Sequence, residues 1–276
     1  MKISVIIVAS GNNIDRYTNA LKQLECLQRQ TVQPLEIIYV EQRLDGERYF
    51  NQLPINFVGQ YKYIGLEFKE HPQLFSVSWC RNVGIYNAKG DVVIALDIDY
   101  MFDDYYIEKL SDTDITDFII GWTSIYYIHN KEKVRCLQDK DFPKGEENIP
   151  GQNRNRLITD LNKPQYAGGI QIFNRRWFID NLAGFSEDMF AHGGEDNDIN
   201  DRYEKLTGNN RKVFNYDIYH LTHGHKQGRK LITQVVMERN RKDPIKTAQL
   251  MRDAGVGSKD APHPIYDDSV KWSLLG

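Results

Sequence analysis

The stretch GDVVIALDIDY, residues 90–100, joins an apolar run to two aspartates. Residues 91–96 are predicted to form a strand, because an uninterrupted apolar run is typical of a strand buried on both faces of a parallel sheet. Asp97 and Asp99 follow it, and alternate residues of a strand share a face, about 6.5–7 Å apart. Two carboxylates held so close repel each other unless a cation lies between them.

Strand and helix patterns alternate on both sides of this stretch. Strands are predicted at residues 3–9, 35–40, 61–66 and 91–96, and helices at 16–30 and 75–88. Such alternation is typical of an α/β protein whose mostly parallel central sheet is flanked by helices in a Rossmann-like arrangement.

The second half of the chain is more mixed. Residues 118–128 are β-like, and residues 139–155 are predicted to be a polar loop. Further strands are predicted at 168–173 and 213–218, and helices at 175–181 and 196–206. Residues 230–252 are expected to form one long helix or two short ones, interrupted at Pro244.

Composition excludes several classes of protein. The net charge is −3 and the isoelectric point about 6.2, whereas nucleic-acid-binding domains are usually basic. The three cysteines are far apart and odd in number, so we expect no disulfide framework. The apolar start is shorter than a signal peptide's core, and no run suits a membrane helix. We therefore expect a cytoplasmic protein, with peripheral contact at the inner face of a membrane left open.

Polar residues follow three of the predicted strands. In doubly wound sheets ligands bind beyond the carboxyl ends of the strands, where Ala9, Ser10, Glu41, Asp97 and Asp99 are expected. Hard ions such as Mg²⁺ and Mn²⁺ prefer carboxylate oxygen and often share their ligand shell with phosphates. An aspartate pair alone is a weak signal, because Asp is common in turns that follow strands.

The surroundings of the aspartates strengthen the signal. SWCRNVGIYNAKGDVVIALDID, residues 78–99, resembles inverting glycosyltransferases of the GT-A fold, and VIIVASGN, residues 5–12, resembles the nucleotide-binding first strand of the family-2 enzymes. The resemblance implies that Arg81 and Asn82 face the diphosphate or ribose of a nucleotide.

The same resemblance extends the nucleotide site along the sheet. It implies that Ala9 and Ser10 border the nucleotide and that Asp97 contributes to its binding. Glu41 stands where the family usually has an Asp pair, and is expected to reach the uracil or the ribose.

A second resemblance lies downstream. YAGGIQIFNRRWFIDNLAGFSEDMFAHGGEDNDINDRY, residues 166–203, resembles the acceptor region of β-1,4-galactosyltransferases and polypeptide N-acetylgalactosaminyltransferases. It implies that Asp196 is the catalytic base, that Glu195 binds sugar hydroxyls, and that Gly169 lies in the donor site. A helix N-terminus also stabilises these carboxylates as anions, by about 0.3–1 kcal/mol. The alternative interpretation is an ordinary acidic helix cap.

Three histidines follow in YHLTHGHK, residues 219–226. In the transferases that the chain resembles, a histidine after the last core strand completes the metal shell. His220 matches that position best, with His223 and His225 as alternatives, so the implied ligands are Asp97, Asp99 and His220. Imidazole suits Mn²⁺ better than Mg²⁺.

Together these features predict one GT-A domain over residues 1–276. Residues 1–100 would bind the nucleotide sugar, 101–227 would bind the acceptor and carry catalysis, and 228–276 would form a helical extension. The predicted activity is metal-dependent (Mn²⁺ or Mg²⁺), inverting transfer of Gal, GalNAc or a related hexose from a UDP-sugar to a carbohydrate or glycoconjugate acceptor, as in polysaccharide biosynthesis.

Two other classes of protein stay open. A nucleotidyltransferase acting on sugar phosphates also places aspartates at strand ends, but it usually opens with a glycine-rich loop that carries Lys or Arg. The turn after the first predicted strand is SGNN. A non-catalytic sugar-nucleotide-binding protein would keep the fold and lose either the metal ligands or the base.

Overall fold

A computed structural model describes residues 1–10, 14–44, 59–69, 75–128, 152–161, 164, 168–189, 194–221 and 230–262. Within these ranges the chain forms a seven-stranded sheet in the order β10-β6-β9-β4-β1-β2-β3 and a four-stranded sheet in the order β5-β11-β7-β8. The strands of the large sheet are β1 (Ile3–Ser10), β2 (Glu36–Arg43), β3 (Gln60–Glu67), β4 (Val92–Asp97), β6 (Phe118–Ile120), β9 (Ile170–Asn174) and β10 (Lys212–Val213). Those of the small sheet are β5 (Tyr100–Met101), β7 (Ser124–Ile128), β8 (Gln152–Leu157) and β11 (Asp217–Leu221).

The large sheet is mostly parallel, as predicted. Strands β4, β1, β2 and β3 run parallel to one another, and only β9 runs antiparallel to its neighbours β4 and β6. The residues from Ile3 to Ala9 in β1 and from Val92 to Leu96 in β4 are buried. Helices covering both faces of the sheet explain why these strands are apolar without alternation.

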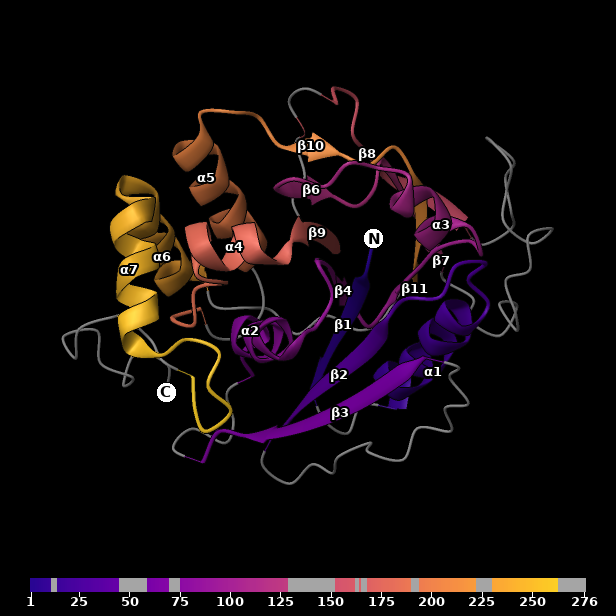
Figure 1. Ribbon diagram of the computed structural model, residues 1–276, viewed down its shortest axis with the longest axis horizontal. Helices are drawn as coiled ribbons and strands as arrows, with labels where there is room; N and C mark the ends of the chain where they lie inside the picture. Colours follow the sequence, from indigo (N-terminus) through magenta and orange to yellow (C-terminus); the bar gives the residue numbers. More distant parts are fainter. Residues whose placement is uncertain are drawn as a thin grey trace.

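The strand order reverses at β1, which places the first two helices on opposite faces of the sheet. The chain passes through α1 (Ile14–Gln28) from β1 to β2, and through α2 (Val77–Asn87) from β3 back to β4 on the other side of β1. Because such crossovers are right-handed, the reversal changes the face. Figure 1 draws α2 and α1 on either side of β1 and β2.

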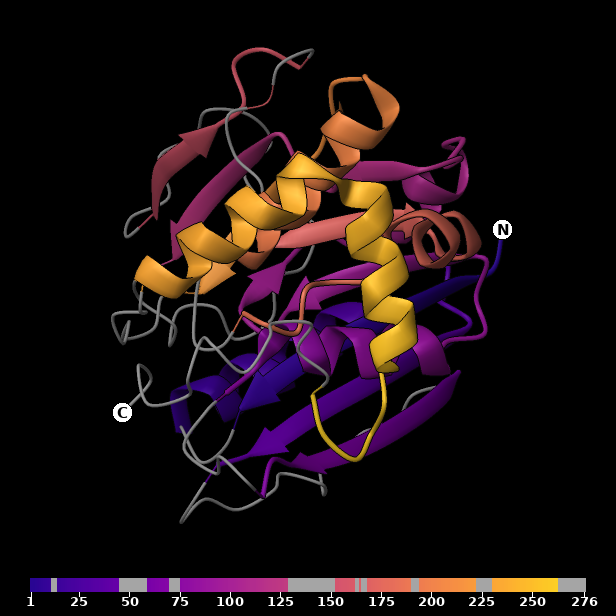
Figure 2. The ribbon, with the colours of Figure 1, turned by 90° about the vertical axis from the view of Figure 1, so that its left-hand side faces the viewer.

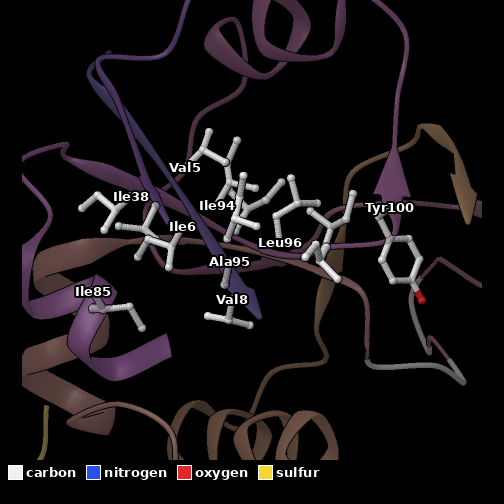
Figure 3. Close-up of a cluster of buried hydrophobic side chains, with 14 of the residues drawn as sticks. Val5, Ile6, Val8, Ile38, Ile85, Ile94, Ala95, Leu96 and Tyr100 are labelled. Carbon is white, nitrogen blue, oxygen red and sulfur yellow. The ribbon is translucent and has the colours of Figure 1, made fainter. Parts of the chain in front are cut away.

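Helix α2 packs very close to the sheet. A Cβ atom added to Gly84 would lie 2.4 Å from Cγ2 of Ile6, so only glycine allows this approach between helix and strand. Ile85 of α2 lies on the side of the sheet to which Ile6 and Val8 point in the core cluster of Figure 3. The close packing fixes the position of the residues that α2 carries toward the carboxyl ends of β1 and β4.

The small sheet joins the segment after the aspartates to the end of the fold. Tyr100 of β5 pairs with His220 of β11, and β11 runs parallel to β7. Residues far apart in sequence therefore meet beside the carboxyl end of β4. The core reaches this point through Tyr100, which lies at one end of the cluster in Figure 3.

Four of the remaining helices gather on one side of the molecule, and α3 (Tyr106–Ser111) lies on the other side in Figure 1. The four are α4 (Arg175–Leu182), α5 (Glu195–Thr207), α6 (Lys230–Lys242) and α7 (Pro244–Ala254). Helix α6 packs on α5, and α7 packs on α4 and α5. Figure 2 shows α6 and α7 crossing the front of this layer. In the described residues, no helix has the length and apolar character needed to cross a membrane.

Two predicted boundaries are wrong. Residues 213–218 do not form one strand: β10 ends at Val213, and β11 begins at Asp217 and contains His220. Residues 152–155 of the predicted loop belong to β8, while 139–151 lie outside the described residues. Residues 230–252 form two helices, the second capped by Asp243 and opened by Pro244.

Candidate active site

Arg81 joins two distant segments at the carboxyl edge of the large sheet. Its Nη2 donates to Oδ1 of Asp97 at 2.7 Å, and its Nη1 donates to Oδ1 of Asp196 at 2.7 Å. Glu195 Oε1 lies 3.8 Å from the same Nη1. Asp196 is 115 positions from Arg81 in sequence, yet both aspartates share one guanidinium. The fold thus brings together four of the predicted site residues.

The guanidinium of Arg81 is almost completely buried, with 1% of its side chain exposed. Burial works to lower the pKa of Arg81, but Asp196, Asp97 and Glu195 outweigh it and hold the pKa above its ordinary value. The ring of Phe185 covers the guanidinium, with Cζ 5.0 Å from the ring centroid. A buried charge persists where it is paired and packed in this way.

Asp196 has the electrostatics expected of a proton acceptor near neutral pH. It is the second residue of α5, and 20% of its side chain is exposed. Burial raises the pKa of Asp196 to about 7, Arg81 opposes this rise, and Glu195 adds to it. A general base works best when its pKa lies near the working pH.

The two glycines before β9, Gly168 and Gly169, pack closely against the residues of this cluster. A Cβ atom on Gly168 would stand 2.5 Å from Oδ2 of Asp196. Gly169 has φ +99°, and a Cβ atom there would stand 2.7 Å from Cζ of Tyr100. Its carbonyl accepts a hydrogen bond from the backbone N–H of Asp97 at 3.2 Å. Gly169 therefore fixes the backbone at the first aspartate.

Asp99 and His220 form a second group next to the first. Oδ2 of Asp99 lies 3.6 Å from Nε2 of His220, and both residues are buried. The imidazole packs between the rings of Tyr100 and Tyr127. A carboxylate oxygen beside an imidazole nitrogen is a donor set that suits Mn²⁺.

The predicted third metal ligand lies apart from this pair. Asp97 places one carboxylate oxygen on Arg81. Within the part of the chain that the structure describes, no three His, Cys, Asp or Glu side chains converge as a metal-binding group. The alternative ligands His223 and His225 lie outside the described residues.

The other predicted nucleotide contacts lie at or below the same edge. Ala9 is buried and Ser10 is partly exposed at the end of β1. Strand β2 continues to Arg43, so Glu41 lies inside the strand, where it is buried and accepts a hydrogen bond from Tyr63 Oη at 2.8 Å. Asn82 is also buried. Their roles as nucleotide contacts stay predictions.

One contributor to the site is not evident from the sequence. Gln23 of α1 is buried, and its Nε2 donates to the carbonyls of Asp97 and Tyr100, at 2.5 Å and 2.9 Å. This single amide spans the turn that carries both aspartates. A glutamine inside an amphipathic helix resembles any surface residue, so no local signal marks it.

The fold is that of the glycosyltransferase class with the GT-A fold. The chain belongs to Glycosyl transferase family 2, which it matches over residues 4–182. Residues 153–226 match a second family, described as the N-terminal domain of galactosyltransferase. The two matches confirm the resemblances noted at residues 78–99 and 166–203.

One relative is also described as a glycosyltransferase. The chain is 29% identical over 140 residues to "Uncharacterized glycosyltransferase YwdF" of Bacillus subtilis (strain 168), a match that covers 49% of the chain and 47% of the relative. The chain thus spans about half the length of that relative.

Solved structures show the same fold. A crystal structure of S. aureus TarS 1–349 matches with a TM-score of 0.51 at 15% identity, covering 80% of this chain and 60% of that one. TarS 1–349 in complex with UDP-GlcNAc matches with a TM-score of 0.53 at 14% identity, covering 99% and 76%. These likenesses confirm the predicted fold.

Proposed function

We propose that the chain transfers a hexose, such as Gal or GalNAc, from a UDP-sugar to an acceptor hydroxyl, with inversion and with a divalent cation. The observation that carries this proposal is the guanidinium of Arg81, which links Asp97 of the donor half to Asp196 of the acceptor half. The TarS complex with UDP-GlcNAc, on the same fold, supports a UDP-sugar as donor. Residues 1–100, 101–227 and 228–276 are the donor, acceptor and helical parts of one domain.

Asp99 and His220 would hold the divalent cation, and Asp97, which lies apart from this pair, stays the third ligand that the sequence predicts. Both side chains present donor atoms of the kinds that Mn²⁺ accepts, and Oδ2 of Asp99 lies 3.6 Å from Nε2 of His220. The bound ion would supply charge stabilisation to the departing diphosphate. Gln23 and Gly169 hold the backbone of this turn in place from two sides.

Asp196 acts as the general base. The acceptor hydroxyl is a poor nucleophile, and a carboxylate with a pKa near 7 can take its proton as the new bond to the anomeric carbon forms. Inversion in a single displacement requires the acceptor and the leaving diphosphate on opposite faces of that carbon. Glu195, next to the base, accepts hydrogen bonds from sugar hydroxyls.

Release of UDP tests the proposal. The protein is incubated with Mn²⁺ and a panel of UDP-sugars, with and without simple acceptor sugars, and UDP is quantified. We expect release from one donor, increased by an acceptor and lost in Asp196→Asn, and a product of inverted configuration by NMR.

Two outcomes would favour the other classes of protein. Pyrophosphate formed from a nucleoside triphosphate and a sugar phosphate would indicate a nucleotidyltransferase. Tight binding of a UDP-sugar with no turnover under any acceptor would indicate a binding protein.

A further inference from the structure

We propose that Asn82 is a positioning residue that fixes Arg81 between Asp97 and Asp196 by clamping Phe185, in place of the nucleotide contact that the family resemblance implies. This inference rests on the proposed function, because Asp196 is taken as the base. It concerns how the turn that follows α4, at residues 183–187, is held against α2.

The side chain of Asn82 is fully used inside the protein. Its Oδ1 accepts a hydrogen bond from the backbone N–H of Phe185 at 2.8 Å. Its Nδ2 donates to the carbonyl of Phe185 at 2.8 Å and to Oε1 of Glu187 at 2.9 Å. An amide nitrogen has two hydrogens, and both have acceptors. Asn82 is buried, so it has no donor left for a nucleotide.

The turn that follows α4 lies outside any helix or strand, so its backbone groups need hydrogen-bond partners from elsewhere. Gly184 has φ +110°, and a Cβ atom there would stand 2.5 Å from Oδ1 of Asn82. The bare backbone at Gly184 lets the turn come close enough for the amide to pair with Phe185. A buried backbone N–H and C=O require partners, and here one side chain supplies both.

Phe185 carries the effect of the clamp to Arg81. Arg81 and Asn82 are neighbours in α2, and the ring of Phe185 lies 5.0 Å from Cζ of Arg81. The ring covers the face of the guanidinium, and the N–H groups at the edge of the guanidinium donate to Asp97 and Asp196. In a close-packed interior a shift of the ring must shift the guanidinium.

The segment after α7 forms hydrogen bonds with both Glu187 and α2. Oε1 of Glu187, which accepts from Asn82, also accepts from the backbone N–H of Gly257 at 2.9 Å. Nε1 of Trp79, in the first turn of α2, donates to the carbonyl of Ser258 at 2.6 Å. Residues 255–258 thus tie α2 and the turn together at a second point.

The test compares Asn82→Ala with Tyr86→Phe. Tyr86 lies one turn along α2 and donates from Oη to the carbonyl of Ala183 at 3.1 Å, so Tyr86→Phe also removes one bond to the same turn but leaves Phe185 held. We expect Asn82→Ala to lower kcat by about 100-fold, as for a misplaced catalytic group, with the affinity for UDP and Mn²⁺ unchanged in calorimetry. Tyr86→Phe should change neither.

A second readout does not depend on transfer. The guanidinium N–H signals of Arg81 in NMR, assigned with Arg81→Lys, should be separate in the native protein and in Tyr86→Phe, because two ion pairs restrict rotation. They should merge in Asn82→Ala. Separate signals in Asn82→Ala would overturn the inference even if the native protein transferred no sugar. If the native protein transferred no sugar and the signals merged in Asn82→Ala, only the proposed function would be contradicted.

The kinetic results can also contradict the inference. A tenfold loss of UDP affinity in Asn82→Ala with unchanged kcat would make Asn82 a nucleotide contact. If Asn82→Ala does not fold, Phe185→Leu decides, because it removes the ring and keeps the backbone clamp. We expect the same loss of kcat in Phe185→Leu, and native kcat with native Arg81 signals would refute the positioning role.

Discussion

Gly168 lies directly against the carboxylate of Asp196: a Cβ atom at residue 168 would stand 2.5 Å from Oδ2. The carbonyl of Gly168 accepts a hydrogen bond from Nε1 of the buried Trp122 at 2.8 Å, so the backbone is held there. The proposed base therefore rests on bare backbone. A methyl group at this position must displace either the carboxylate or the strand start.

Gly168→Ala should lower kcat by about 100-fold, because misplacing a catalytic group by about 1 Å costs that much. The affinity for UDP should not change, since the three atoms nearest to the added methyl group all belong to Asp196. Steady-state kinetics with saturating donor and calorimetry with UDP measure the two quantities.

Gly208→Ala is the matched control for this substitution. Gly208 ends the same helix, α5, with φ +69°, and a Cβ atom there would meet nothing within 4 Å. The strained backbone should lower the free energy of unfolding by about 1–2 kcal/mol and leave kcat as it is. Native kcat in Gly168→Ala would show that Asp196 is not the base or is not held by this contact.

Asp196→Asn should remove most of the turnover and leave the binding of the donor unchanged. The amide keeps the size of the side chain but cannot accept the proton, so kcat should fall by about 10²–10⁴-fold. Arg81 keeps Asp97 and Glu195 as partners, so UDP should bind with nearly native affinity. Turnover at the native rate would rule out Asp196 as the base.

The activity should fall on the acidic side of neutral pH. Burial raises the pKa of Asp196 to about 7, and only the ionised form can take a proton. As pH falls through 7 the base becomes protonated, so kcat/KM should drop tenfold for each further pH unit. A profile measured with Mn²⁺ from pH 5 to 9 would show this limb; a flat profile down to pH 5 would contradict the assignment.

The central strands could be predicted because each contains a continuous apolar run, at residues 5–9, 37–40 and 92–96. Such runs in β1, β2 and β4 occur where helices cover both faces of a sheet, and the aspartates after β4 mark its carboxyl end. The direction of β9 could not be predicted. Residues 170–174 resemble any buried strand, and only the fold shows that they pair antiparallel with β4.

The sequence also did not predict that His220 lies inside a strand, β11, rather than after one. Residues 213–218 look like a strand because apolar and polar side chains alternate there. In the structure Phe214 and Tyr216 stack on each other, and both rings meet Tyr106 edge-on. The bond between Arg81 and Asp196 was equally hidden, because 115 positions separate its partners. Local patterns identified both residues, and only the fold shows that they share one ion pair.

Arg81→Met should destabilise the protein. Removing the guanidinium leaves three neighbouring carboxylates without their cation, and breaking a buried pair costs about 3–5 kcal/mol. Because Asp97 and Asp196 keep 27% and 20% of their side chains exposed, we expect the free energy of unfolding, measured in urea at pH 8, to fall by about 3 kcal/mol.

The loss in Arg81→Met should shrink at pH 5. Without Arg81 the carboxylates bind protons more readily in the folded state than in the unfolded state, so acid favours folding of this variant. Arg176→Met is the control: Arg176 pairs with Asp180 on the surface at 92% exposure, and its loss should matter little. An equal loss in the two variants would show that the cluster contributes no stability.

Asp99→Asn should separate metal binding from nucleotide binding. The amide oxygen is a weaker ligand than the carboxylate, so the affinity for UDP in the presence of Mn²⁺ should fall at least about tenfold. With the metal chelated, the variant and the native protein should bind UDP equally, because Asp99 faces His220 and not the Arg81 cluster. Asp114→Asn, an exposed carboxylate on the connection after α3, makes the same change in charge and should leave both affinities as they are. If Mn²⁺ raised the affinity for UDP equally in Asp99→Asn and in the native protein, the ion would have to bind elsewhere, and the proposed role of the Asp99–His220 pair would be lost.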